Sequence, residues 1–135
     1  RQVELFQDFA AQAGAKYPVY AATMQAMYDT RREHFQMLVE SGVLLLMGTD
    51  SGGYQDHGTI AGELDLWSEW GAPAQTTIDA ATWMSQRYLG YPGLVNGGPA
   101  DFLILDADPR DDPVNLSRPV SVTLGGATVW ERPPA

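Results

Sequence analysis

The residues of this chain best placed to do chemistry lie in one glycine-rich loop, residues 48–58. Asp50 stands three residues after the longest apolar run, Val43–Met47. That run has no polar alternation, which is typical of a parallel-sheet strand buried on both faces, and parallel barrels concentrate their chemistry at the carboxyl ends of their strands. Its position therefore makes Asp50 a candidate catalytic residue. The competing interpretation is an ordinary turn residue, since aspartate side chains readily bond to nearby backbone groups in turns.

Two neighbours of Asp50 raise further possibilities. His57 lies in the same loop, where its imidazole can contact a substrate or serve only to order the loop, and the sequence does not separate these roles. Ser51 carries the hydroxyl of a nucleophile, but no histidine and acid follow at a recognisable triad spacing, so we discard that role. The glycines are not a phosphate-binding motif, because the lysine and the hydroxyl residue of that motif are absent.

Helices are predicted on both sides of this loop. Apolar residues recur at three- and four-residue spacings before it, and glycines or a Gly-Pro pair mark the helix ends. Thr59 can cap the first helix after the loop. The predicted helices cover residues 1–13, about 21–41, 59–70 and about 75–89.

The pattern changes to that of strands beyond a loop rich in glycine and proline, residues 91–99. Gly125-Gly126 is a two-residue hairpin signal between the last two strands. Asp101 and Asp106 bracket the first strand, where we expect them to anchor loops rather than to bind metal. The predicted strands are Phe102–Leu105, Val120–Leu124 and Ala127–Trp130.

The composition limits the partners of this protein. Its 17 acidic and 8 basic residues give a net charge of -9, which repels phosphate backbones and anionic lipid head groups. No apolar run approaches the roughly 20 residues of a membrane span. The absence of cysteine excludes disulfides and thiolate metal sites. We therefore expect a soluble protein that binds neither nucleic acid nor membrane. Acidic residues interrupt the apolar positions of residues 1–13, unlike a secretory signal, so cytoplasmic is the default expectation for its location.

An ordered series of short motifs resembles the amidohydrolase superfamily. The series spans about Tyr17 to Trp130, and the likeness is nearest to the imidazolonepropionase-like and prolidase-like branch. Its members, in chain order, are Gly48-Thr49-Asp50-Ser51-Gly52, Asp56-His57-Gly58, Glu63-Leu64, Ala80-Ala81-Thr82, Leu89-Gly90, the segment 97–106 and the terminal hairpin around Gly125-Gly126.

The resemblance implies an α/β fold in two parts. Residues 1–92 would be the C-terminal part of a (β/α)8 TIM-like barrel, with Val43–Met47 as its last strand. Residues 93–135 would supply strands of a small, flanking, composite β-sandwich domain. Because such barrels need roughly 250 residues, the N-terminal part of the barrel would lie outside this chain.

The resemblance also assigns roles. Asp50 would bind a divalent metal weakly, expected to be zinc, act as general base on a metal-bound water, and pass the proton to the leaving nitrogen. His57 would contact substrate. The other ligands of that superfamily include a His-x-His pair and two further histidines, whereas this chain has only His34 and His57. Most metal ligands would therefore lie outside it.

The sequence hypothesis is thus a metal-dependent amidohydrolase that cleaves carbon–nitrogen bonds in an amide, a cyclic amide or a dipeptide, with this chain inactive alone. Its partners would be the small-molecule substrate and the missing part of the barrel, and a homo-oligomer stays open. Two alternatives remain: a non-catalytic α/β interaction module derived from such an enzyme, or one half of a two-chain hydrolase.

Overall fold

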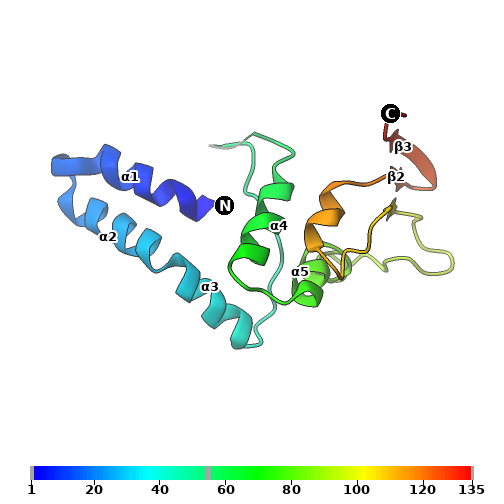
Figure 1. Cartoon of the computed structure of the whole chain (residues 1–135), viewed down its shortest axis with the longest axis horizontal. Helices are drawn as coiled ribbons and strands as arrows, with labels where there is room; N and C mark the ends of the chain where they lie inside the picture. Colours follow the sequence, from blue (N-terminus) through cyan, green and yellow to red (C-terminus); the bar gives the residue numbers. More distant parts are fainter. Residues whose placement is uncertain (1, 54–55, 135) are drawn as a thin grey trace. The chain divides into compact units, whose positions relative to one another are not determined.

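The chain forms two compact units (Figure 1). A computed structural model describes residues 2–53 and 56–134. The first unit comprises Arg1–Leu45 and Thr49–Thr59, and the second comprises Leu46–Gly48 and Ile60–Ala135. The loop with Asp50 and His57 therefore belongs to the first unit. The predicted domain division after residue 92 stays a prediction.

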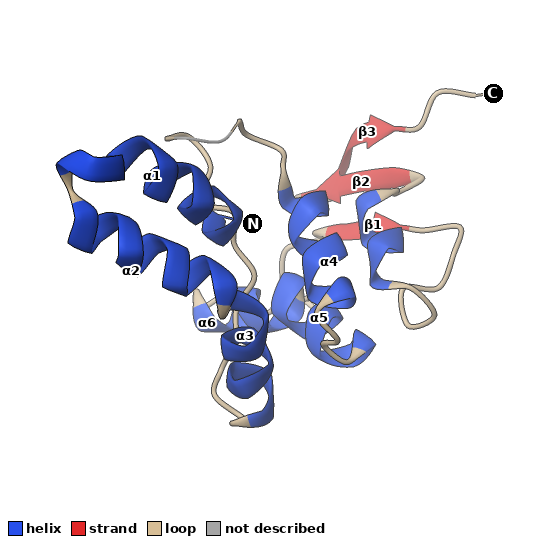
Figure 2. Cartoon of the chain, turned by 60° about the vertical axis from the view of Figure 1, so that its left-hand side comes forward, coloured by secondary structure: helices blue, strands red, loops and turns tan. Residues whose placement is uncertain are grey.

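The first unit is helical. Its elements are η1 (Gln2–Leu5), α1 (Phe6–Ala13), η2 (Gly14–Lys16), α2 (Pro18–Asp29) and α3 (Arg31–Glu40). The helices α1 and α2 lie side by side (Figures 1 and 2). Pro18 opens α2, a position where its missing N–H costs nothing.

Arg31 ties the two ends of this helical array together. Its Nε donates to Glu4 Oε1 at 2.7 Å, and its Nη1 donates to the carbonyl oxygen of Tyr28 at 2.7 Å. The guanidinium carbon also lies 3.7 Å from the centroid of the Tyr28 ring, in cation–π range. These contacts hold the start of α3 to η1.

Two of the predicted helices each divide at a threonine. The helix expected over residues 21–41 divides at Thr30, whose Oγ1 donates to the carbonyl oxygen of Ala26 at 2.9 Å. The helix expected over residues 75–89 divides at Thr82, whose Oγ1 donates to the carbonyl oxygen of Ile78 at 2.7 Å. At both positions the backbone leaves the helical region, with φ -98° and ψ 3° at Thr30 and φ -129° and ψ -109° at Thr82.

The second unit holds most of the buried side chains. Its helices are α4 (Ile60–Glu69), α5 (Ala74–Ala81) and α6 (Trp83–Tyr88), and α4 packs against α5 and against η3 (Pro113–Ser117). Leu64, at 2% exposed, and Trp67 are buried on α4, and Thr77 and Ala80 are buried on α5. None of the helices in the described residues is long and apolar enough to cross a membrane.

The end of α4 has the expected glycine stop. Gly71 has φ 85°, its N–H donates to the carbonyl oxygen of Ser68, and the N–H of Ala72 donates to that of Trp67. This pair of bonds is the Schellman arrangement, which satisfies the last carbonyls of a helix. The predicted end of this helix at Gly71 is confirmed.

A three-stranded antiparallel sheet completes the second unit, in the order β1 (Phe102–Ile104), β2 (Ser121–Leu124), β3 (Ala127–Glu131) (Figure 2). Gly125 and Gly126 have φ 57° and 81°, as a two-residue hairpin requires. Asp101 Oδ1 accepts from the N–H of Gly125 at 2.6 Å, and Asp106 pairs with Arg132 at 2.6 Å. The predicted strands, hairpin and anchoring aspartates are confirmed.

The predicted fold class is wrong. Over the described residues, six α-helices accompany one antiparallel sheet, which is neither part of a (β/α)8 barrel nor a β-sandwich. The error begins at Val43–Met47, which forms no strand. Val43 and Leu44 are more than half exposed, and among the described residues the run makes one backbone–backbone hydrogen bond, from the N–H of Met47 to the carbonyl oxygen of Ala80 at 3.1 Å. An unbroken apolar run shows a tendency to be buried, but a strand also needs a neighbour to complete its ladder.

Candidate functional site

Asp50 has an unusual backbone conformation. Its φ is 50°, and within residues 2–53 and 56–134 it is the one non-glycine residue with positive φ. The left-handed region costs a non-glycine residue roughly 1–2 kcal/mol, although aspartate tolerates it better than most. Such outliers persist where surrounding contacts hold them, and they cluster at functional sites. The side chain of Asp50 is exposed.

Three hydroxyl groups surround Asp50 in the sequence and contact one another. The Ser51 hydroxyl donates to Thr49 Oγ1 at 2.6 Å, and the Ser51 N–H approaches the same oxygen at 3.3 Å. Ser51 Oγ also lies 3.1 Å from Thr59 Oγ1. We call Thr49, Ser51 and Thr59 the hydroxyl chain. All three are half-buried, so they join the two ends of the loop under partial shelter from water.

His57 packs against the backbone of Gly52. A Cβ built on Gly52 would lie 3.1 Å from His57 Cε1 and 3.4 Å from its Nε2. Gly52 also has φ 106°, a conformation that L side chains rarely adopt. The loop therefore needs glycine at this position for two reasons, backbone conformation and room for the imidazole ring.

The structure places both predicted site residues in the same segment, Thr49–Thr59 of the first unit. The segment carries Asp50 in a left-handed turn and His57 on Gly52. Their predicted roles, general base and substrate contact, stay predictions. The hydroxyl chain was not anticipated, and the signal that could have revealed it is the recurrence of Thr and Ser at 49, 51 and 59 around a glycine-rich turn.

The described residues do not by themselves form a metal site. Nowhere among them do three His, Asp or Glu side chains gather in a way that could hold an ion. Asp50 offers one carboxylate, and a divalent ion takes four or more ligands. The predicted zinc would therefore require ligands from elsewhere.

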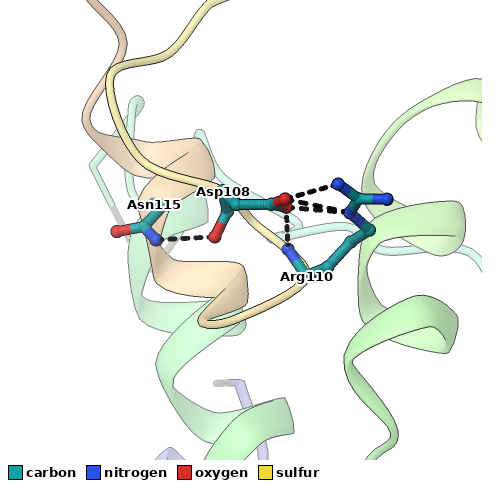
Figure 3. A network of polar contacts seen from close by, with 3 residues as sticks. All are labelled: Asp108, Arg110 and Asn115. Carbon is teal, nitrogen blue, oxygen red and sulfur yellow. Dashed lines mark hydrogen bonds and ion pairs between the residues drawn. The ribbon is translucent and has the colours of Figure 1, made fainter.

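A second polar network surrounds Asp108 at the entry to η3 (Figure 3). Arg110 Nη2 lies 2.5 Å from Asp108 Oδ2, and Arg110 Nε lies 3.0 Å from both carboxylate oxygens. Asn115 Nδ2 donates to the carbonyl oxygen of Asp108 at 2.9 Å. The hydrogen bonds from Arg110 lower the pKa of Asp108 to about 2. This network shapes a turn, since the carboxylate is already fully engaged by a neighbouring residue.

Comparison with known proteins gives relatives but no activity. No family model matches the chain. Over 118 residues, 87% of its length, the chain is 38% identical to an uncharacterised protein of Mycobacterium bovis and to uncharacterised proteins of two strains of Mycobacterium tuberculosis. The matched region is 32% of each relative, so the chain spans about a third of the length of the curated relatives it matches.

Proposed function

We propose that this chain is one segment of a longer hydrolase of carbon–nitrogen bonds, in which Asp50 is the general base. The observation that carries the proposal is the conformation of Asp50, a left-handed aspartate held in a turn by contacts between its flanking residues. The ordered motifs that resemble amidohydrolases support it, as does the length of the mycobacterial relatives, which leaves room for further site residues.

In this proposal the Asp50 carboxylate accepts a proton from a water molecule that attacks the carbonyl carbon of an amide. A carbon–oxygen bond forms, and the carbonyl electron pair moves to oxygen. The electron pair on that oxygen then re-forms the carbonyl bond as the carbon–nitrogen bond breaks, and Asp50 gives its proton to the leaving nitrogen. A positioned general acid–base of this kind contributes about 10²- to 10⁴-fold to the rate. His57, in the same segment, contacts the substrate.

The remaining parts of the site come from outside the described residues. A bound divalent metal would supply Lewis acidity, and most of its ligands would belong to other parts of the longer protein. In this proposal the chain contributes one carboxylate, that of Asp50, and one imidazole, that of His57. It also gives a reason for the many exposed apolar side chains, because a larger protein would cover some of them.

The test begins with the codons in frame before Arg1. The polypeptide that the gene encodes around this chain is expressed with added zinc and assayed for amine release from linear amides, cyclic amides and dipeptides. We expect Asp50→Asn to lower kcat by 100-fold or more. Asp56→Asn, in the same loop and also exposed, is the matched control and should retain activity. Undiminished hydrolysis by Asp50→Asn, or no hydrolysis of any of the three classes by the wild type, would contradict the proposal.

A second candidate function is a non-catalytic interaction module. The observation that favours it is an apolar hollow of about 620 Å³ in the second unit, lined by α6, the loop that follows it, β1 and β2. Leu89 and Leu94 at its edge are about 70% exposed. A reading frame that is closed just before Arg1 would favour this alternative, because Asp50 would then lack the other groups of a hydrolytic site.

A further inference from the structure

We propose that Ser51 and Thr59 are positioning residues that hold Asp50 in its left-handed conformation. The inference rests on the proposed function for its catalytic meaning. Its geometric content is independent of that function. The observation behind it is the hydroxyl chain, whose members stand immediately before Asp50, immediately after it, and nine residues beyond it.

The direction of the hydrogen bonds follows from proton counting. Each hydroxyl has one proton to donate and two lone pairs to accept with. Ser51 donates its proton to Thr49 Oγ1, so it can only accept at its contact with Thr59. Thr59 is therefore the donor in that 3.1 Å contact. The hydroxyl chain runs from Thr59 through Ser51 to Thr49, and each oxygen polarises the next.

The hydroxyl chain constrains Asp50 because it joins the two residues on either side of Asp50. Thr49 Oγ1 accepts from both the hydroxyl and the N–H of Ser51, so the backbone must curl tightly between residues 49 and 51. Asp50 occupies that curl with φ 50°. Loss of the Ser51 hydroxyl would remove the shorter of the two bonds and leave the left-handed turn without its main support.

Thr59 acts at a distance in the sequence. Its contact with Ser51 closes the loop that carries His57, whose ring rests on Gly52 beside Ser51. One hydroxyl therefore contacts the turn at Asp50 from the far side of His57 in the sequence. No signal in local periodicity assigns Thr59 this role, since the sequence shows it only as a helix cap.

The test uses NMR on the full chain and isosteric variants. Thr59→Val removes the hydroxyl with little change in volume, Thr59→Ser retains it, and Ser51→Ala removes the central link. Thr23→Val is the control, because the Thr23 hydroxyl bonds only within α2, to the carbonyl oxygen of Val19. The amide–Hα coupling and the Cα chemical shift of Asp50 report its φ.

We expect Thr59→Val and Ser51→Ala to shift Asp50 out of the left-handed region, and Thr59→Ser and Thr23→Val to leave it there. A left-handed Asp50 in both Thr59→Val and Ser51→Ala overturns the proposal. Unchanged amide shifts in α1 and α2 would show that the first unit is still folded, and if Thr59→Val fails that check, Ser51→Ala decides.

Kinetics on the longer protein then connect position to chemistry. Thr59→Val should lower kcat about 10- to 100-fold with KM within twofold, since small misplacements of a catalytic group cost rate rather than binding. Thr59→Ser should restore kcat. If the wild type hydrolyses no amide while the NMR result holds, the proposed function fails and the positioning of Asp50 stands. A normal kcat in Thr59→Val would refute the idea that this positioning matters for catalysis.

Discussion

Substitution of Gly52 by alanine measures how tightly the candidate loop is built. Gly52 has φ 106°, and a non-glycine residue in such a region costs roughly 1–3 kcal/mol. The new Cβ would also lie 3.1 Å from His57 Cε1, so the exposed ring has to shift by a few tenths of an ångström. We expect Gly52→Ala to reduce the free energy of unfolding of this segment by about 1–3 kcal/mol, chiefly through the backbone conformation.

The neighbouring glycine is the matched control. Gly53 does not have positive φ, and a Cβ there meets no atom within 4 Å. Gly53→Ala should therefore leave the free energy of unfolding unchanged. The double variant Gly52→Ala, His57→Ala should recover the part of the lost unfolding free energy that is due to the ring, but not the part that is due to the backbone. Urea titrations followed at amide peaks of residues 49–59 give these values. Equal stability of Gly52→Ala and Gly53→Ala would refute the geometry.

Three further predictions concern Leu64, with Leu94 as its control, Arg110 and Asp50. Leu64→Ala, at a side chain only 2% exposed, should cost about 2–5 kcal/mol in urea unfolding followed by tryptophan fluorescence. Leu94→Ala, at 71% exposed, should cost almost nothing, and similar losses would show that the assigned core is wrong. Arg110→Ala should return the pKa of Asp108 from about 2 towards 3.8, as carbon-detected NMR titration would report. Because the pKa of Asp108 is lowered in the folded state, the Asp108–Arg110 pair stabilises the fold above pH 3.8, and this stabilisation is lost as the pH falls through about 2. The exposure of Arg110 to solvent keeps the effect small. A titration unchanged by the substitution would mean that Arg110 is not the cause. Asp50→Gly should raise the melting temperature, since glycine adopts positive φ freely. The same substitution should abolish hydrolysis by the longer protein. A lowered melting temperature would argue against strain at this position.

Local signals in the sequence predicted much of the secondary structure. Gly71 ends its helix and Gly125-Gly126 forms its hairpin because positive φ is available to glycine almost without cost, and the chain needs no distant partner for either. Asp101 was expected to anchor a loop, and it accepts from the hairpin itself. The placement of Asp50 in a turn after an apolar segment followed from the same kind of reasoning.

The features that the sequence did not predict all depend on partners that are distant in the sequence or on the local path of the backbone. Val43–Met47 has the composition of a buried strand, but composition does not supply the second strand of a ladder. Within the part of the chain that the structure describes, Met47 alone of these five residues has a backbone partner. The helices divide at Thr30 and Thr82 through changes of backbone angle that a hydrophobic pattern does not encode. The contact between Ser51 and Thr59 likewise depends on how the loop closes.

The connectivity of the sheet has a consequence for the order in which the second unit folds. β2 and β3 are joined by two glycines, and hairpins of this kind form in about 1–10 μs. β1 is separated from β2 by residues 105–120, so we expect it to dock after the hairpin, because a larger loop has to close at a greater entropic cost. The bond from Gly125 to Asp101 forms only at that later stage. Substitutions in β1 should accordingly accelerate unfolding while leaving the rate of folding almost unchanged.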